Sequence, residues 1–299
     1  MRTPAAEHLI RQRINAIGRL LPGAKEGDVP SLHQARVATR RLREALPLVT
    51  RGAKAEKLTR AVRRLTRALG PVRELDVALA ILDELDAAPD APRQGIQRLR
   101  VAIAAERKPL RTELRRRIDE FDIDKLLKKS VAAARKHDVP GTRDAHHMAV
   151  TRARIARRAE RLEATIESAA GLYLPDRLHE VRIAVKKLRY AIELSQNPNS
   201  ARGSSRTSAR LKLLKGVQDL LGRMHDLEVL IARTRGIQSS PGASTLKVSG
   251  DLDRLVRRLE TECRQLHGGY MAVRRDLISL CHRLIAAAER DTHSRTTAA

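Results

Sequence analysis

A stretch of fifteen residues occurs twice in the chain, and this duplication constrains the fold more than any other feature. The first copy is LHQARVATRRLREAL at residues 32–46, and the second is LHEVRIAVKKLRYAI at residues 178–192. His33 aligns with His179, and every other basic residue of the first copy aligns with a basic residue in the second. A chain that repeats such a stretch at matched positions is expected to contain two similar halves.

Each copy has the pattern of an amphipathic helix. At about 100° per residue, four of the basic side chains fall within a sector of about 80°, namely His33, Arg36, Arg40 and Arg43. This sector borders an apolar stripe that includes Leu32 and Ala35 and runs to Val49. An ordinary solvated basic surface would lie opposite the stripe, so a cationic row in this position can be partly enclosed by another helix.

Composition favours packed helices over a β-sandwich. The 299 residues are 42% hydrophobic but include only three Tyr, one Phe and no Trp, so the core must consist of Leu, Ile, Val and Ala. Charged residues make up 32% of the chain, with a formal net charge of +25. An imbalance of this size predicts a polyanionic partner: nucleic acid, an anionic membrane surface or a phosphate polymer.

Two features of the sequence predict a cytoplasmic protein. No apolar run approaches the roughly 18 residues needed to span a bilayer, and the N-terminal residues lack the apolar core of a signal peptide. Cys263 and Cys281 would lie about 27 Å apart along one predicted helix, whereas a disulfide requires Cα atoms within about 7 Å. Both are expected to be reduced thiols in the core.

Helical periodicity and its interruptions predict the other elements. The predicted helices are 5–21, 31–51, 54–69, 72–85, 92–118 and 121–136, then 148–170, a second basic helix from 175, one that ends near 221, and 251–289. Polar links are predicted at 137–147, 195–208 and 237–250. Helix breaks are expected at Pro22-Gly23 and Gly70-Pro71, and Ser31 is the expected N-cap of the first basic helix.

These elements predict an all-α fold of two pseudo-symmetric four-helix bundles that arose by internal duplication, because no alternating β pattern is present. We expect one domain over residues 1–290, with halves at about 1–136 and 146–290. The last residues, 291–299, are expected to form a disordered tail.

A second motif is also duplicated, as LGPVRELDVAL at 69–79 and LGRMHDLEVLI at 221–231. The acids in it have two interpretations. They either take a favourable place in the first turn of a new helix, or Asp76 and Glu228 reach across to orient a basic side chain of the row. The aligned pairs are Gly70 with Gly222, Arg73 with His225, Glu74 with Asp226 and Asp76 with Glu228.

The basic rows are either solvated surface or an anion site. Facing cations repel one another in a partly desolvated groove unless an anion lies between them, and Arg and Lys bind phosphate oxygens through charge-assisted hydrogen bonds. Because the pattern occurs twice, we interpret it as an anion site. The candidate contacts are His33, Arg36, Arg40, Arg41, Arg43, Arg60, Arg63, Arg64 and Arg67 in the first half, and His179, Arg182, Lys186, Lys187, Arg189, Lys212 and Lys215 in the second.

The histidines of the rows are either structural side chains at a helix start or donors to phosphate, which bind it more strongly when protonated. A metal ligand is the weaker interpretation, since the neighbours of His33 and His179 one turn away are Arg36 and Arg182. The sequence contains no Walker-type loop and no HExxH, GxSxG or CxxC motif. We therefore predict no metal, no cofactor and no catalytic activity, and we expect His146-His147 to be exposed in the linker.

The two doubled motifs together resemble the CHAD family, the conserved histidine α-helical domain. The resemblance rests on the HxxRVxxRRLR-type helix at His33 and His179 and on the LGxxRDxD-type segment at Gly70 and Gly222, and it covers nearly the whole chain. It implies a pseudo-twofold pair of four-helix bundles with a central basic pore. It also implies binding of inorganic polyphosphate and association with polyphosphate granules.

Carried over by motif position, the resemblance also implies particular polyphosphate contacts. The second half departs from the family pattern, with His225 where Arg is expected and Glu228 in place of Asp. Some relatives carry a triphosphatase domain with an ExExK signature, which this sequence lacks, so hydrolysis is not implied. The implied contacts are His33, Arg36, Arg40, Arg43, His179, Arg182, Lys186 and Arg189.

The leading hypothesis is therefore a non-enzymatic protein that binds polyphosphate in a basic groove or pore between its halves, in the cytoplasm and at polyphosphate granules. The alternative is a nucleic-acid-binding protein. We expect nucleic acid to bind only weakly and non-specifically, because the sequence has few aromatic residues for base stacking and no recognisable recognition module. A phosphate-transfer enzyme would need a carboxylate-held metal or a phosphate loop.

Overall fold

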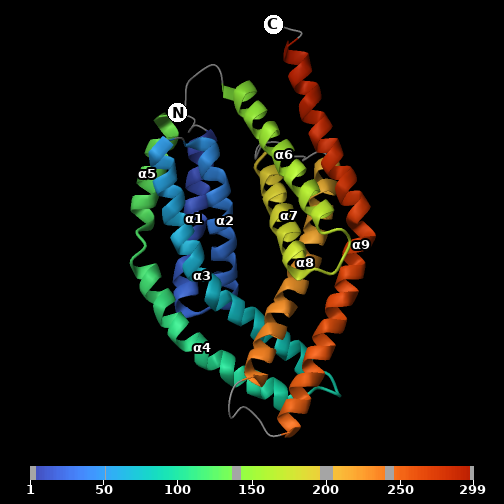
Figure 1. Ribbon diagram of the computed structural model, residues 1–299. Helices are drawn as coiled ribbons and strands as arrows, with labels where there is room; N and C mark the ends of the chain where they lie inside the picture. Colours follow the sequence, from blue (N-terminus) through green and yellow to red (C-terminus); the bar gives the residue numbers. More distant parts are fainter. Residues whose placement is uncertain (1–4, 51, 137–142, 196–204, 240–245, 297–299) are drawn as a thin grey trace. The chain divides into compact units, whose positions relative to one another are not determined.

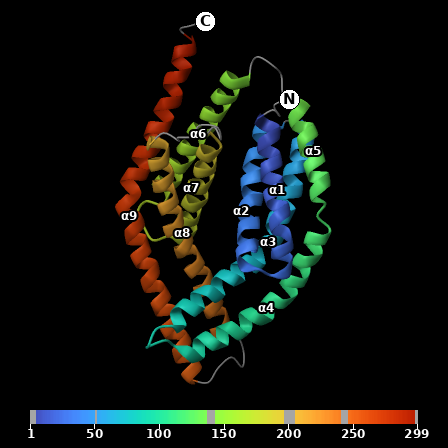
Figure 2. The same ribbon diagram turned by 180° about the vertical axis from the view of Figure 1, so that it is seen from behind.

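The computed structural model describes residues 5–50, 52–136, 143–195, 205–239 and 246–296. Within these ranges every regular element is an α-helix, so the all-α prediction is confirmed (Figures 1 and 2). The chain divides into two compact units, which we call unit 1 (Met1–Arg143) and unit 2 (Asp144–Ala299). The helices are α1 (Ala5–Glu26), α2 (Val29–Val49), α3 (Gly52–Asp86), α4 (Arg93–Asp119), α5 (Ile123–Lys136), α6 (Arg143–Ser168), α7 (Pro175–Ser195), α8 (Ser205–Gln238) and α9 (Leu246–Thr296).

Unit 1 is built around the apolar faces of α1, α2 and α3. Ile10, Ile14 and Ile17 recur at helical spacing along α1 and are wholly buried. α2 packs against both α1 and α3, and α5 packs against α1 (Figure 1). Leu32 and Leu42 of α2 are buried in the same core. The apolar stripe of the first basic helix therefore faces the other helices of unit 1.

α3 is one continuous helix, and the break predicted at Gly70-Pro71 is wrong. Pro71 removes one helical hydrogen bond, but Leu69 and Val72 on either side of the pair are buried in the core. Gly70 also lacks the Cβ whose clash with a following proline disfavours helical backbone. The helix is therefore bent rather than ended, and α3 changes direction along its length in both views (Figures 1 and 2).

The connection between α1 and α2 is shorter than the sequence predicts. α1 continues through Pro22-Gly23 to Glu26, so the predicted break there is wrong. The N-cap of α2 is Asp28, not Ser31: the Asp28 carboxylate accepts a hydrogen bond of 2.8 Å from the backbone N–H of Ser31. The same contact lowers the pKa of Asp28. Asp28 therefore caps the N-terminus of α2, the helix that carries the first copy of the duplicated basic stretch.

In unit 2, α8 packs against both α7 and α9. The apolar stripe of α7 is buried, with Leu178, Val181, Val185 and Leu188 at helical spacing. α8 does not end near residue 221 but continues to Gln238. The duplicated LG motif of unit 2 therefore lies inside a helix, as it does in unit 1.

α9 is longer at both ends than the predicted helix over 251–289. It includes residues 291–296, which were expected to belong to a disordered tail; no Gly or Pro interrupts the sequence there. Residues 297–299 lie outside the described residues, as do 196–204 of the predicted polar loop and 137–142 of the predicted boundary. The side chains of His146 and His147 also lie outside them.

Two expectations about the chain's chemistry can be compared with these helices. Cys263 and Cys281 are free, buried thiols, which confirms that prediction, and burial raises the pKa of each to about 12. In the described part of the chain, no helix combines the length and apolar character needed to cross a membrane.

Candidate functional site

The duplicated helices carry two sets of basic side chains. In both sets most side chains are half-buried beside the apolar stripe, whereas His33 is exposed and Lys186 is buried, with 7% exposure. Partial burial of a cation raises its electrostatic cost and also strengthens its attraction for an anion. We call His33, Arg36, Arg40, Arg41 and Arg43 of α2 the first basic row, and His179, Arg182, Lys186, Lys187 and Arg189 of α7 the second basic row.

Within each unit the two duplicated motifs lie against each other. A Cβ placed on Gly70 would lie 3.9 Å from Nε of Arg36, and one placed on Gly222 would lie 3.8 Å from Nε of Arg182. The guanidinium of the row arginine therefore rests beside the backbone of the following helix in both units. The two duplicated motifs of each unit are therefore in contact in space.

His33 of the first basic row has a defined hydrogen-bond partner. Nε of Arg73, in α3, donates to Nδ1 of His33 at 3.0 Å. Although His33 is exposed as a residue, partial desolvation of its ring, followed by the charges of Arg73 and Arg36, lowers its pKa, so the imidazole is neutral at neutral pH. Because Nδ1 accepts from Arg73, the neutral ring carries its proton on Nε2, where it can be donated to an anion.

The aligned position of unit 2 has a different partner. Nδ1 of His179 lies 3.1 Å from Nδ1 of His225 in α8, and the two ring centroids are 4.4 Å apart with planes tilted by 47°. Burial lowers the pKa of His225 to about 4, with further contributions from the charges of Arg182, His179 and Lys186. Two imidazoles therefore occupy the place that an imidazole and a guanidinium occupy in unit 1.

The acids of the second motif have other partners than the predicted ones. Asp76, buried in α3, forms an ion pair with Arg107 of α4, whose Nε donates to Oδ1 at 2.7 Å. Glu228 accepts a short hydrogen bond from the Tyr173 hydroxyl, and burial raises the pKa of Glu228. Asp76 and Glu228 therefore contact side chains outside the basic rows, and a role in orienting the rows stays a prediction.

Four exposed arginines on α3 add to the basic side chains of unit 1. They recur at i, i+3, i+4 and i+7 and therefore share one helix face. None of them has a carboxylate partner among the described residues. These arginines are Arg60, Arg63, Arg64 and Arg67.

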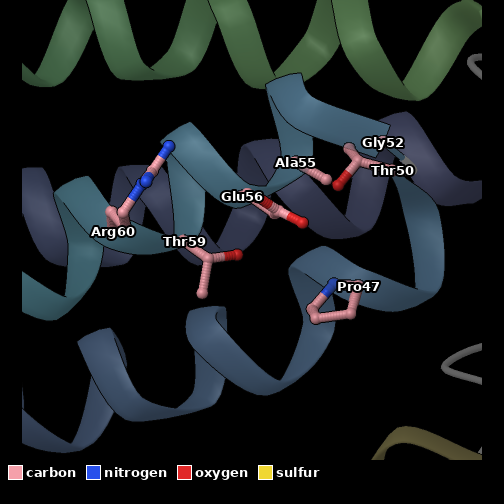
Figure 3. Close-up of a pocket in the computed structure, with 7 residues that line it drawn as sticks. All are labelled: Pro47, Thr50, Gly52, Ala55, Glu56, Thr59 and Arg60. Atoms are coloured by element: carbon pink, nitrogen blue, oxygen red, sulfur yellow. The ribbon is translucent and has the colours of Figure 1, made fainter.

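A shallow surface hollow lies where α2 ends and α3 begins (Figure 3). Glu56 and Thr59 line it together with Pro47 of α2, and Arg60 extends at its edge. A carboxylate at its wall disfavours an anion there. Glu56 and Arg60 carry opposite charges at its wall, so the hollow itself offers no net positive charge to a phosphate.

Two predicted contacts of unit 2 already have carboxylate partners. Nε of Arg189, whose side chain is 12% exposed, lies 3.5 Å from Glu193, and Nζ of Lys215 lies 2.7 Å from Asp219. Lys212 is exposed. An anion that approached Arg189 or Lys215 would have to compete with these acids. Part of the positive charge at Arg189 and Lys215 is therefore already compensated within unit 2.

The sequence-based prediction missed two residues that touch the rows, Arg73 and His225. Both stand at the same position of the second motif, and the alignment of an arginine with a histidine was the signal that could have identified them. Among the residues that the structure describes, no group of three or more His, Cys, Asp or Glu side chains is placed to hold a metal ion.

Solved structures with similar folds include two proteins of different origin. The crystal structure of the CHAD domain from the plant Ricinus communis has 23% sequence identity and a TM-score of 0.59, and the match covers 95% of this chain and 90% of that one. PptA from Streptomyces chartreusis has 15% identity and a TM-score of 0.64, with coverage of 93% and 98%. At these identities the likeness shows the fold. A comparison with curated proteins finds no match.

The family model described as the CHAD domain matches residues 8–235. This range includes both copies of both duplicated motifs and most of the chain. The protein therefore belongs to the CHAD domain family.

Proposed function

We propose that this protein binds inorganic polyphosphate through its two basic rows and catalyses no reaction. The observation that supports the proposal most strongly is the contact between motifs in each unit, where the row arginine lies beside the glycine of the next helix and the row histidine is hydrogen-bonded one turn away. This contact positions the hydrogen-bond donors of the row before any ligand arrives. Polyphosphate binding is also what the family resemblance implies.

The donors suit a chain of phosphates. Arginine binds two phosphate oxygens with its planar fork, lysine acts as a point charge, and the neutral His33 can donate from Nε2. Partial burial beside the apolar stripe keeps the donors of each row in a low-dielectric setting, where their attraction for phosphate oxygens is stronger than in water. The exposed arginines of α3 would extend the contact surface along the chain in unit 1.

We infer a binding role rather than phosphoryl transfer from the groups that accompany the rows. Phosphoryl transfer relies on carboxylates that hold metal ions and orient the nucleophile. Two acids of the second motif are engaged outside the rows, Asp76 with Arg107 and Glu228 with Tyr173. A protein that binds polyphosphate without consuming it would be retained at polyphosphate granules in the cytoplasm, which is the localisation we propose.

Nucleic acid is the second candidate, favoured by the net charge of +25. Any cationic surface that binds a polyanion releases counterions, so both ligands should bind less tightly as salt is raised. Base stacking would distinguish nucleic acid, but the chain has only three Tyr, one Phe and no Trp to provide it. We therefore expect nucleic acid to bind only through general surface charge.

The test is a competition assay in which long-chain polyphosphate displaces labelled duplex DNA. Two row variants are compared with the wild type: Arg36→Glu with Arg40→Glu, and Arg182→Glu with Lys186→Glu. Each should weaken polyphosphate binding by at least about 10-fold, since hydrogen bonds to charged groups contribute about 1.5–3 kcal/mol each. The matched control, Lys125→Glu with Lys129→Glu, has the same charge change on the exposed face of α5 and should weaken it much less.

The outcomes separate the candidates. Polyphosphate should displace DNA at a much lower phosphate concentration, and the row variants should remove this preference while part of the DNA binding persists. Additive losses from the two row variants would indicate separate sites, and a full loss from either would indicate one shared site. Equal competition per phosphate, with parallel losses for both ligands in the row variants, would refute the polyphosphate proposal in favour of nucleic acid.

A further inference from the structure

The histidines of the two rows differ in the partner at one aligned position. In unit 1 the partner is Arg73, which donates to Nδ1 of His33. In unit 2 it is His225, whose Nδ1 lies 3.1 Å from Nδ1 of His179. A guanidinium can only donate hydrogen bonds, whereas an imidazole nitrogen either donates or accepts. The partner therefore determines which ring nitrogens can donate to a phosphate.

In unit 1 the donor is present without any change of protonation. Nδ1 of His33 must accept, because Arg73 has only N–H groups to offer. The neutral ring of His33 then carries its proton on Nε2. A proton added at Nδ1 would face the N–H of Arg73, so phosphate binding at this histidine requires no proton from solution.

In unit 2 the neutral pair has one donor too few. One Nδ1–H donates to the other Nδ1, so the donating ring has a bare Nε2, which accepts hydrogen bonds and repels a phosphate oxygen. One added proton at that Nε2 turns it into a donor, and both rings then present Nε2–H. A second added proton would leave two Nδ1–H donors facing each other with no acceptor between them, which is unfavourable. The pair can therefore take up one proton, and it gains a donor by doing so.

The surroundings of the pair oppose this proton until an anion arrives. Burial is the main cause of the lowered pKa of His225 on α8, and the charges of Arg182, His179 and Lys186, which face it from α7, lower the pKa further. A bound phosphate would compensate these charges and thereby raise the pKa. In unit 1, by contrast, the charges that face His33 are Arg73 of α3 and Arg36 of α2.

We propose that the second basic row binds phosphate together with one proton, which the His179–His225 pair holds, whereas the first basic row binds phosphate without taking up a proton. This inference rests on the proposed function, and it assigns Arg73 and His225 as the residues that set the difference. Acidification then increases the affinity of unit 2 for a phosphate chain and leaves the affinity of unit 1 nearly unchanged.

The test measures proton uptake by calorimetry. Long-chain polyphosphate is titrated into the full chain at pH 7 in two buffers that differ in ionisation enthalpy, and affinity is followed from pH 8 to pH 6. The wild type should take up protons, with affinity rising by up to about 10-fold per pH unit for one linked proton. His225→Arg, which copies unit 1, should abolish the uptake, and Arg73→His, which copies unit 2, should increase it.

His8→Gln serves as the control, because His8 is an exposed histidine of α1 and should leave the uptake unchanged. If His225→Arg fails to fold by circular dichroism, His225→Gln replaces it with the same expected loss of uptake. Binding with equal proton uptake in the wild type and the His225 variant would overturn this inference alone. If polyphosphate does not bind the wild type, the proposed function fails and the inference with it.

Discussion

The two basic rows have nearly the same sequence pattern but different electrostatic settings. In unit 1 the histidine is paired with a permanent cation, Arg73, and four exposed arginines on α3 have no carboxylate partner in the described chain. In unit 2 the histidine is paired with His225, and acids accompany Arg189 and Lys215. The duplication has therefore kept the contact between helices while the charge around it has changed. Geometry and charge at such a site can vary independently.

Asp76 and Glu228 of the second motif also occupy aligned positions but differ in the charge of their partners. Asp76 and Glu228 align in sequence, yet the first is bound to a guanidinium and the second to a phenol. An ion pair with Arg107 needs the charged form of Asp76, whereas a hydrogen bond from Tyr173 can be accepted by a neutral group as well. Matched substitutions in the two units can test how far the likeness between them extends.

The largest effect is expected from matched substitutions in the cores, Leu42→Ala in unit 1 and Leu188→Ala in unit 2. Both leucines are wholly buried at aligned positions, so each substitution should lower the free energy of unfolding by about 2–5 kcal/mol. Denaturant unfolding measures the loss. Labelling of Cys263 and Cys281 assigns it to a unit, because both cysteines of the chain lie in unit 2 and are unreactive while buried.

Leu188→Ala should therefore accelerate thiol labelling, and Leu42→Ala should change it little if the two units open independently. Equal acceleration by both variants would show that the units unfold together. That result would contradict the division of the chain into two units with separate cores.

A smaller difference is expected between Asp76→Asn and Glu228→Gln. Asp76→Asn leaves Arg107 without its carboxylate in a setting where Asp76 is only 2% exposed, and should cost about 1–3 kcal/mol of stability. Glu228→Gln keeps an oxygen that accepts from Tyr173, and should cost less than about 1 kcal/mol. Thermal or urea unfolding compares them, with a double-mutant cycle on Asp76 and Arg107 as the control. A larger cost at Glu228 would contradict this account.

Much of the fold could be predicted because helix-forming periodicity is a property of short stretches. The buried positions of α2 and α7 recur at helical spacing, so both basic helices were predicted with the correct apolar face. Helix ends could not be predicted in the same way. Whether a helix continues through Pro71 depends on the burial of Leu69 and Val72 by other helices, and local proline and glycine signals do not contain that information.

The same distinction between local pattern and tertiary packing applies to the candidate site. The rows themselves could be predicted, since their members share one face of one helix. Arg107 lies 31 residues from Asp76, and Tyr173 lies 55 residues from Glu228, so neither partner follows from spacing within a motif. The contact between His33 and Arg73, which are 40 residues apart, likewise depends on how α2 packs against α3.

Acidification offers a test of unit 1 alone. Glu7 of α1 accepts hydrogen bonds from Arg11 at 2.8 Å and from Arg135 of α5 at 2.7 Å, and these contacts, Arg135 first, lower the pKa of Glu7 to about 2. A lowered pKa means that the stabilisation is present above the ordinary value of 4.5 and is lost as pH falls towards 2. Unit 1 should lose stability across this interval, and Glu7→Gln should flatten the loss.

Circular dichroism from pH 5 to pH 2 follows the transition in both proteins, and thiol labelling reports unit 2 in the same samples. An equal acid response in the wild type and in Glu7→Gln would show that the contact of Glu7 with Arg11 and Arg135 does not stabilise unit 1.

The smallest expected effect distinguishes the two glycines of the LG motif. Both lie inside helices, and the Cβ of an alanine would meet the row arginine at an ordinary contact distance, 3.9 Å at Gly70 and 3.8 Å at Gly222. Alanine is more favourable than glycine in a helix interior by about 0.5–1 kcal/mol, so Gly222→Ala should stabilise unit 2 by that amount. Gly70 precedes Pro71, whose ring disfavours helical backbone in a residue with a Cβ.

Gly70→Ala should therefore gain little or lose stability, although the two positions align. Urea unfolding of both variants measures the difference, and polyphosphate binding should be unaffected because Arg36 and Arg182 keep their places. Equal gains at the two positions would show that the proline imposes no such restriction on α3. If the difference is found, glycine is needed at this position in unit 1 for the backbone before a proline, whereas in unit 2 the ordinary contact distance to Arg182 does not require it.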